Sequence, residues 1–238
     1  MQNKTYNFDK VIPRTGTNCV KWDLRSLYFK NPDLIPLWVA DMDFETPDFI
    51  IDSLRKRLDH PVLGYTFRPA SFNHSFQKWA LKKYSWDIKP DWIGFSPGVV
   101  SAVSIAIMGF TEPGDEILVQ PPVYFPFFKS VQGLGRELRY NPLKEIDGRL
   151  CMDFENLENA ITLKTKMLIL CNPHNPGGSA WTPEELRKLA GICSKHDIFI
   201  VSDEIHSDLI FEPAVHTPFI EAAPEYANKS ITMMAASK

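Results

Sequence analysis

The chain has 238 residues, of which 44% carry hydrophobic side chains, so it can bury a core and can form one domain or two. Its formal net charge of −3, with acidic and basic residues intermixed, argues against nucleic acid or an anionic membrane as a partner. We therefore expect a small-molecule ligand.

The cysteines and the N-terminus bear on the compartment. Cys19, Cys151, Cys171 and Cys193 show neither a CxxC pair nor the spacing of metal ligands. They fit buried thiols in a reducing cytosol better than a disulfide framework. The N-terminal MQNKTYNFDK has no apolar core, and no stretch nears the roughly 18 continuous apolar residues of a membrane span. These features predict a soluble, cytoplasmic protein without a metal site.

The first part of the chain predicts an arm followed by two helices. Residues 1–45 are rich in Pro, Trp and Asp and indicate an extended arm outside the sheet. Thr46 and Pro47 begin a helix, and a second helix ends near Tyr84. Apolar residues recur at helical spacing in both: Ile50, Ile51, Leu54, Leu58, Phe72, Phe76 and Trp79.

The rest of the chain alternates short apolar runs with amphipathic stretches. Residues 99–110 (VVSAVSIAIMGF) are mostly apolar and predict a buried helix, closed by a turn at 112–115. A capping box at 182–185, with proline at the first helical position, begins another helix. Strands are predicted at EILV, RELRY, KMLILC, IFIVS and SITMM. The pattern indicates an α/β fold with a mostly parallel sheet covered by helices on both faces.

Unusual polar or aromatic residues follow four of these strands, at the edge where open α/β sheets bind ligands. KMLILC leads into a loop of prolines and glycines with Asn175, and IFIVS leads into Asp203 and His206. EILVQ leads to Tyr124, and SITMM leads to Lys238. Each has an ordinary structural interpretation: a strand-end Asp usually caps a helix or forms a turn, and an aromatic ring beside others usually belongs to the core.

Together, these side chains match the needs of a pyridine-ring aldehyde phosphate. An aldehyde needs an amine, which Lys238 offers. The ring stores electrons only if its nitrogen stays protonated, which requires a buried carboxylate such as Asp203. A phosphate sits well at a helix N-terminus, here the amides near Val99 and Val100, with a hydroxyl such as that of Ser237.

A resemblance to fold-type I pyridoxal-phosphate (PLP) enzymes is carried by several segments in consistent order: IPLWVADMDF, GYT at 64–66, PGVVSA, EPGDEILVQPPVYFPFF, CNPHNPGG, SDEIHSDL and the closing SK. Within these enzymes the chain is similar to the cystathionine β-lyase and cystalysin-like branch of the class I/II aminotransferase superfamily. The likeness covers nearly the whole chain, including the early RTGTNCVKWD. It implies a PLP-dependent transferase-like large domain at 46–238, after an N-terminal arm and the start of a small-domain region at 1–45.

The resemblance also implies a role for each residue around the cofactor ring. Lys238 corresponds to the Schiff-base lysine, and Asp203 to the partner of the pyridine nitrogen. Asn175 and His206 correspond to residues near the phenolic oxygen. Tyr124 corresponds to the ring that stacks on the cofactor.

Further implied contacts involve the phosphate and a second subunit. Ser237 and the amides of Val99 and Val100 correspond to the groups that hold the phosphate. Tyr65 corresponds to a residue that reaches the neighbouring subunit's site, so the resemblance implies a homodimer.

Two features depart from the family pattern. Relatives commonly read NPxNPxGRxW, whereas this chain has serine at Ser179, which bears on loop salt bridges more than on chemistry. Relatives also continue past the lysine into the rest of the large domain and a C-terminal small domain that supplies the arginine for the substrate's α-carboxylate. We therefore expect the 238 residues to be part of a longer protein, and we expect the C-terminal small domain to be missing from this part.

The resemblance favours β-elimination at carbon–sulfur bonds of cystathionine or cysteine conjugates, giving a thiol, pyruvate and ammonia. One alternative is an aminotransferase that acts on an amino acid with the same residues. Another is a regulatory protein that uses this fold to bind a partner. A nucleotide-binding domain is disfavoured because neither GxxxxGK[ST] nor GxGxxG occurs.

Overall fold

The chain divides into two compact units, Met1–Pro69 and Ala70–Lys238, and the computed structural model describes residues 5–237. This division falls at 69/70, after the first long helix, whereas the sequence analysis set its boundary at 45/46. A division by contacts does not say which residues belong to a cofactor-binding domain. The assignment of 46–238 to that domain therefore stays a prediction.

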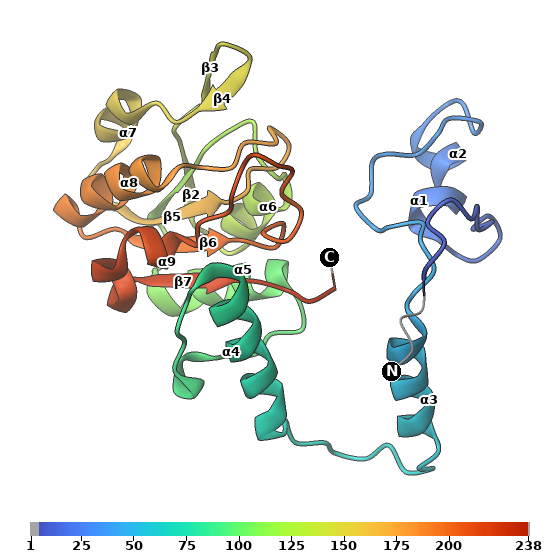
Figure 1. Ribbon diagram of the computed structural model, residues 1–238. Helices are drawn as coiled ribbons and strands as arrows, with labels where there is room; N and C mark the ends of the chain where they lie inside the picture. Colours follow the sequence, from blue (N-terminus) through green and yellow to red (C-terminus); the bar gives the residue numbers. More distant parts are fainter. Residues whose placement is uncertain (1–4, 238) are drawn as a thin grey trace. The chain divides into compact units, whose positions relative to one another are not determined.

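The first unit is built from short elements (blue in Figure 1). Two helical segments, α1 (Val20–Asp23) and α2 (Arg25–Tyr28), lie within the region expected to be extended, so that expectation was wrong in detail. Local hydrogen bonds that the composition did not reveal close these turns, such as Asp23 N–H to the Cys19 carbonyl. The helix α3 (Asp48–Leu58) confirms the helix predicted after Thr46 and Pro47.

Asp43 is the centre of the contacts in the first unit. Its Oδ1 accepts hydrogen bonds from Arg14 Nη1 and Trp22 Nε1, each at 2.7 Å, and its Oδ2 accepts one from Lys21 Nζ at 2.7 Å. The bond from Lys21 is the main cause that holds the pKa of Asp43 far below its usual range, although burial opposes it. Arg14 also pairs with Asp41. One carboxylate thus ties the RTGTNCVKWD segment to the ADMDF segment.

The second unit contains a five-stranded sheet in the order β2-β1-β5-β6-β7, in which every neighbouring pair is parallel. Its strands are β1 (Glu116–Val119), β2 (Glu137–Tyr140), β5 (Thr165–Cys171), β6 (Phe199–Asp203) and β7 (Ser230–Met233). A separate antiparallel hairpin, which the sequence analysis missed, joins β3 (Lys144–Ile146) to β4 (Arg149–Cys151). The predicted parallel sheet is confirmed.

The helices of the second unit are α4 (Ala70–Tyr84), α5 (Val99–Phe110), α6 (Pro126–Gly133), α7 (Phe154–Ala160), α8 (Pro183–Lys195) and α9 (Phe219–Ala222), with 3-10 turns η1 (Pro90–Trp92) and η2 (Pro224–Lys229). The capping box of α8 has both of its hydrogen bonds, between Thr182 and Glu185. No helix among residues 5–237 combines the length and apolar character that a membrane crossing requires.

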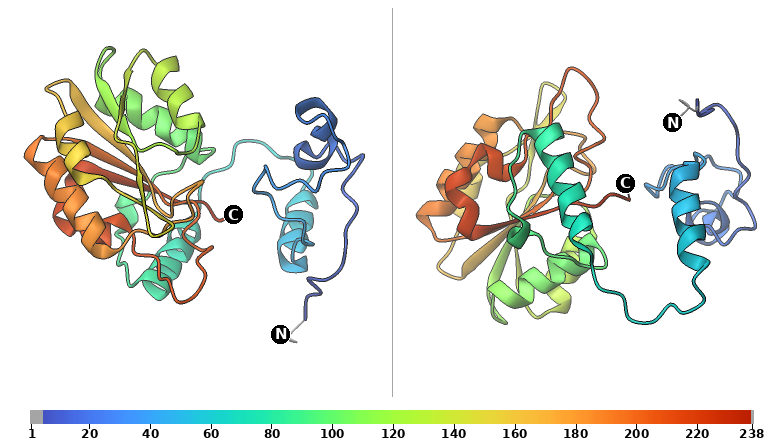
Figure 2. Two further views of the ribbon diagram at one scale, coloured as in Figure 1. Left: turned by 90° about the horizontal axis from the view of Figure 1, so that it is seen from above. Right: turned by 60° about the horizontal axis from the view of Figure 1, so that its bottom comes forward.

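Side-chain alternation along the strands divides the core of the second unit into two clusters. Leu118, Leu168 and Ile200 pack against α8 on one face of the sheet. Ile117 and Ile169 pack against α5 and α6 on the other. Figure 2 shows the orange helix α8 and the green helices α5 and α6 on opposite sides of the strands. The expected cover of helices on both faces is therefore confirmed.

The sequence predicted that helix α5 would be buried, but only one of its faces is. Val103 and Ile107 are fully buried, but Ile105 and Met108 are each 55% exposed and Phe110 is 51% exposed. A helix turns by 3.6 residues, so packing one face on a sheet leaves the opposite face uncovered in this chain.

Candidate functional site

The carboxyl ends of three neighbouring strands meet in one row of side chains. Cys171, the last residue of β5, pairs with Asp203, the last residue of β6, and Asp203 pairs with Met233, the last residue of β7. Neighbours in register on a parallel sheet point to the same face, so the Asp203 side chain lies between those of Cys171 and Met233. Asp203 is only 4% exposed. A buried carboxylate therefore lies at the edge where the sequence predicts ligand binding.

The Asp203 carboxylate forms a backbone hydrogen bond and contributes to the raised pKa of two nearby side chains. Its Oδ1 accepts the backbone N–H of Ile205 at 3.1 Å. Burial, and after it the charge of Asp203, raises the pKa of Tyr124 and raises that of Cys171 to about 12. Tyr124 is half-buried, and its ring meets that of Phe127 edge-on, with 5.7 Å between centroids. Tyr124 thus packs against the core, as is usual for an aromatic ring beside others, and it is also a neighbour of Asp203.

Hydrogen bonds between its own residues fix the loop after β5. His174 N–H donates to the Ser179 carbonyl, and Gly178 N–H donates to the His174 carbonyl, each at 2.8 Å. The His174 ring is buried, which lowers its pKa to about 4, and its Nδ1 accepts the N–H of Gly177 at 3.2 Å. A Cβ on Gly177 would come within 2.8 Å of that Nδ1, so any larger residue would force its neighbours to shift. The half-buried Asn175 is therefore presented by a fixed backbone.

The N-terminus of α5 lies at the same edge of the sheet. Val99 belongs to the buried cluster that contains Val119, Cys171 and Met233, which end β1, β5 and β7. Gly98 precedes the helix, and no side-chain hydrogen bond caps it. The first backbone amides of a helix have no partner within the helix and attract anions. This end of α5 fits a phosphate.

The other predicted residues are placed as follows. His206 is half-buried, close after Asp203 in the chain, and Ser237 is exposed beyond β7. Lys238 lies outside the described residues. Tyr65 belongs to the first unit and is fully exposed. The structure thus brings Asp203, Asn175, Tyr124, Val99 and Val100 to one edge of the second unit, and the roles given to all of these residues stay predictions.

Ser179, where relatives commonly carry arginine, has a clear structural role. Its hydroxyl donates to the Leu150 carbonyl of β4 at 2.9 Å. From the same strand, Arg149 reaches Glu185 of α8 with bonds of 2.7 and 2.8 Å, and its guanidinium lies 5.5 Å from the Trp181 ring centroid. Ser179 therefore ties the loop to the β3–β4 hairpin, and Arg149 of that hairpin forms a salt bridge with α8.

Sequence reasoning missed a buried polar cluster behind Asp203. Glu204 is fully buried and accepts hydrogen bonds from Ser202 Oγ at 2.9 Å and from Phe219 N–H at 2.8 Å. Its other oxygen lies 2.7 Å from His216 Nε2. Glu204 N–H donates to the Met233 carbonyl at 2.8 Å and so extends the pairing of β6 with β7. The acidic pair DE after a buried strand was visible in the sequence, but its partner His216 is distant along the chain.

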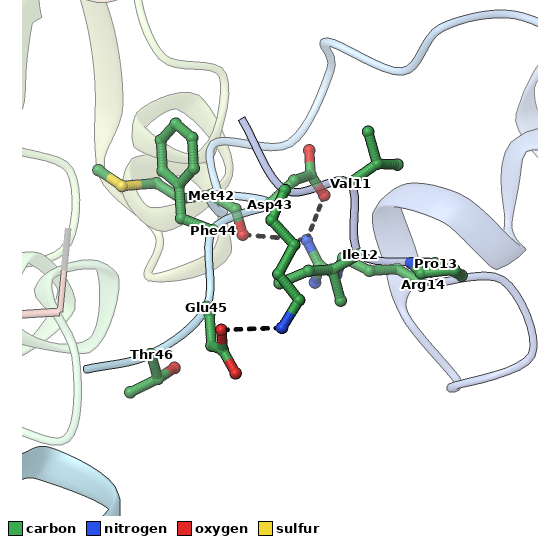
Figure 3. Close-up of a pocket in the computed structure, with 10 residues that line it drawn as sticks. Val11, Ile12, Pro13, Arg14, Met42, Asp43, Phe44, Glu45 and Thr46 are labelled. Atoms are coloured by element: carbon green, nitrogen blue, oxygen red, sulfur yellow. Dashed lines mark hydrogen bonds and ion pairs between the residues drawn. The ribbon is translucent and has the colours of Figure 1, made fainter. Parts of the chain in front are cut away.

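The first unit has an open hollow of about 440 Å³ between the segments 10–14 and 42–46 (Figure 3). Lys10 and Glu45 pair across it at 3.1 Å, and Val11, Ile12 and Phe44 line it. None of the residues predicted to bind the cofactor lines this hollow.

Comparison with known proteins agrees with this geometry. The family model "Aminotransferase class I and II" matches residues 32–238. The chain belongs to this family. Among curated members, it is 46% identical over 233 residues to "Cystathionine beta-lyase PatB" of Bacillus subtilis, covering 98% of this chain and 60% of that protein.

Solved structures in the family are similar over almost the whole chain. Cystalysin from Treponema denticola, solved with pyridoxal 5'-phosphate, has a TM-score of 0.93 and 39% identity, covering 98% of this chain and 60% of that one. The PLP-bound C–S lyase from Staphylococcus hominis has a TM-score of 0.91 and 33% identity, covering 99% and 60%. The chain therefore has the fold of PLP-bound family members and spans about 60% of the length of these relatives.

Proposed function

We propose that this chain provides the PLP-binding part of a carbon–sulfur β-lyase, which releases a thiol, pyruvate and ammonia from cystathionine or related cysteine conjugates. The observation that carries the proposal is the buried Asp203 at the end of β6, in register with Cys171 and Met233. The names of the relatives, a cystathionine β-lyase and C–S lyases, support the reaction class.

The described residues fit PLP. A carboxylate that is 4% exposed suits a cationic partner such as a protonated ring nitrogen, because a nearby positive charge favours its ionised form. The N-terminus of α5, which no side chain caps, suits a dianionic phosphate. Asn175 offers an amide on a rigid loop at the same edge.

Bound PLP supplies an electron sink for the charge that develops at the substrate's α-carbon. In the proposed assignment, Asp203 holds a proton on the ring nitrogen, which keeps that sink effective. Tyr124 shields one face of the ring from water. Asn175 and His206 orient the phenolic oxygen by hydrogen bonds.

The remaining groups bind the cofactor and transfer a proton. The amides of Val99 and Val100 and the hydroxyl of Ser237 hold the phosphate. Lys238 would hold the cofactor through its amine until the substrate's amine displaces it, and the freed lysine amine would then take the proton from the substrate's α-carbon. Loss of the thiolate from the β-carbon then follows from the negative charge at the α-carbon.

The first test is pyruvate release from cystathionine by the purified full-length protein, with PLP present and no keto acid added. We expect steady release. Lys238→Ala should lower it by about 10²–10⁴-fold, the usual contribution of a positioned acid–base group. Asp203→Asn should lower it while Asp147→Asn, in an exposed turn of the second unit, should not. Wild-type rates in Lys238→Ala would contradict the proposal.

The second candidate is an aminotransferase, favoured by the family description that matches residues 32–238. The two reactions differ in the need for an acceptor. Turnover that requires an added keto acid and yields no pyruvate from cystathionine would replace the lyase by the aminotransferase.

We also propose a cytoplasmic homodimer. Tyr65, which is fully exposed in the first unit, is available for a second chain. Cys19, Cys151, Cys171 and Cys193 are all free thiols, which suits a reducing compartment. Light scattering that gives a monomer, or fractionation that places the protein outside the cytoplasm, would contradict these statements.

A further inference from the structure

The thiol of Cys171 contacts the backbone on which Asn175 stands. Its Sγ accepts the N–H of Asn175 at 3.2 Å and lies 3.5 Å from the Pro173 carbonyl, to which its S–H donates. Only the protonated thiol can both accept and donate. Burial, with the charge of Asp203 as a second cause, raises the pKa of Cys171 to about 12, so the thiol stays protonated at neutral pH.

The side chain of Cys171 lies beside that of Asp203. Cys171 pairs with Asp203 across β5 and β6, and Met233 pairs with Asp203 from β7. The backbone is fixed here: Trp181 Nε1 donates to the Cys171 carbonyl at 2.8 Å, and Asn172 N–H donates to the Asp203 carbonyl at 2.9 Å. Two uncharged sulfur side chains thus flank the carboxylate.

We propose that Cys171 is a positioning residue for the cofactor site, which holds the Asn175 backbone and the Asp203 carboxylate in fixed relation through one neutral thiol. This inference rests on the proposed function. Cys171 does not itself touch substrate or cofactor in this assignment. It acts through the amide of Asn175 on one side and through the environment of Asp203 on the other.

Cys193 provides a matched control. It is also fully buried, and burial raises the pKa of its thiol to about 12. It lies in α8 and packs in the cluster on the opposite face of the sheet. Replacing either cysteine removes a buried thiol, but only Cys171 contacts the Asn175 loop.

The test compares Cys171→Ser, Cys171→Ala and Cys193→Ser by PLP titration, by the visible circular dichroism of bound PLP, and by hydrogen exchange at residues 172–178 without PLP. Serine has a shorter Cβ–O bond and does not reach the Asn175 amide as sulfur does. We expect both Cys171 variants to bind PLP at least about fivefold more weakly, because a buried N–H loses its acceptor. Their circular dichroism should change and exchange at 172–178 should accelerate, whereas Cys193→Ser should resemble wild type in all three.

Each outcome decides a separate question. Cys171 variants with wild-type affinity and dichroism would overturn the positioning role, as would equal losses in Cys193→Ser. Unchanged exchange at 172–178 would overturn the thiol contact itself. Wild-type protein that binds no PLP would instead overturn the proposed function, while the exchange measurement would still decide the contact of Cys171 with the loop.

Discussion

The two units of this chain are stabilised by different forces. Within the described part of the first unit, only Lys21 and Pro36 are buried, and the main contacts join Asp43 to charged and polar donors. The second unit buries a continuous apolar core on both faces of its sheet. Packed cores respond to changes of volume, whereas part-exposed ion pairs respond to pH and salt. The comparison therefore predicts different sensitivities for the two regions.

The largest effect is expected at the buried Glu204–His216 pair, which lies among the apolar side chains of the second unit. His216→Phe removes the donor that lies 2.7 Å from the fully buried Glu204 carboxylate. Glu204 keeps its bonds from Ser202 and Phe219. Removing one partner of a buried pair should nevertheless lower the free energy of unfolding by about 3–5 kcal/mol, measured by urea denaturation. Lys195→Met, which breaks the exposed pair with Glu158, should cost about 0–1 kcal/mol. Equal losses would contradict the distinction between buried and exposed pairs.

The same substitution should have opposite signs at two glycines of the second unit. Gly177→Ala places a Cβ 2.7 Å from Leu150 Cδ1, so overpacking should cost about 1–3 kcal/mol. Gly191→Ala, inside α8 with nothing within 4 Å, should stabilise by about 0.5–1 kcal/mol. Thermal unfolding of both variants measures this, and a stabilised Gly177→Ala would contradict the packing of the loop after β5.

The first unit should be sensitive to one charge. Asp43→Asn keeps the shape of the side chain but weakens three charge-assisted hydrogen bonds, and we expect a local loss of about 1 kcal/mol after allowance for solvent screening of this part-exposed group. Hydrogen exchange over residues 14–43 should accelerate and exchange in β5 should not. Asp52→Asn, in an exposed helix pair with Arg55, serves as the control.

The same carboxylate predicts a pH dependence of the first unit. The pKa of Asp43 is lowered in the folded state, chiefly by the bond from Lys21. Its contribution is therefore fully present above the unfolded pKa of about 4 and is lost as the pH falls below it. Protection from exchange over residues 14–43, measured relative to the intrinsic exchange rate at each pH, should fall with acid in wild type. A similar fall in Asp43→Asn would assign the pH dependence to other groups.

The smallest effect is expected for a part-exposed ion pair within the second unit. A double-mutant cycle with Arg149→Ala and Glu185→Ala should give a coupling free energy of about 0.5–1 kcal/mol that falls with added salt. The exposed Arg187–Glu184 pair should give a smaller value of about 0.3 kcal/mol. A coupling that exceeds that of the buried Glu204–His216 pair would contradict the comparison.

Local pattern predicted much of the second unit and less of the first. The capping box at Thr182, the apolar strands and the start of the helix at 99–110 each depend on neighbours along the chain, so they were predicted correctly. The short α1 and α2 and the β3–β4 hairpin were missed because they lack a long periodic pattern. The exposed face of α5 was missed because apolar side chains, such as Ile105, Met108 and Phe110, also lie on that face.

The sequence by itself determined which residues end the strands, and hence that Asp203, Asn175 and Tyr124 belong to one edge of a parallel sheet. That follows because parallel strands direct their carboxyl ends to the same edge. Only the tertiary structure decided which side chains flank these residues. Register places Cys171 and Met233 beside Asp203, and the fold brings His216 to Glu204 and Arg149 to Glu185. Such contacts join residues distant in the chain, and only packing fixes them.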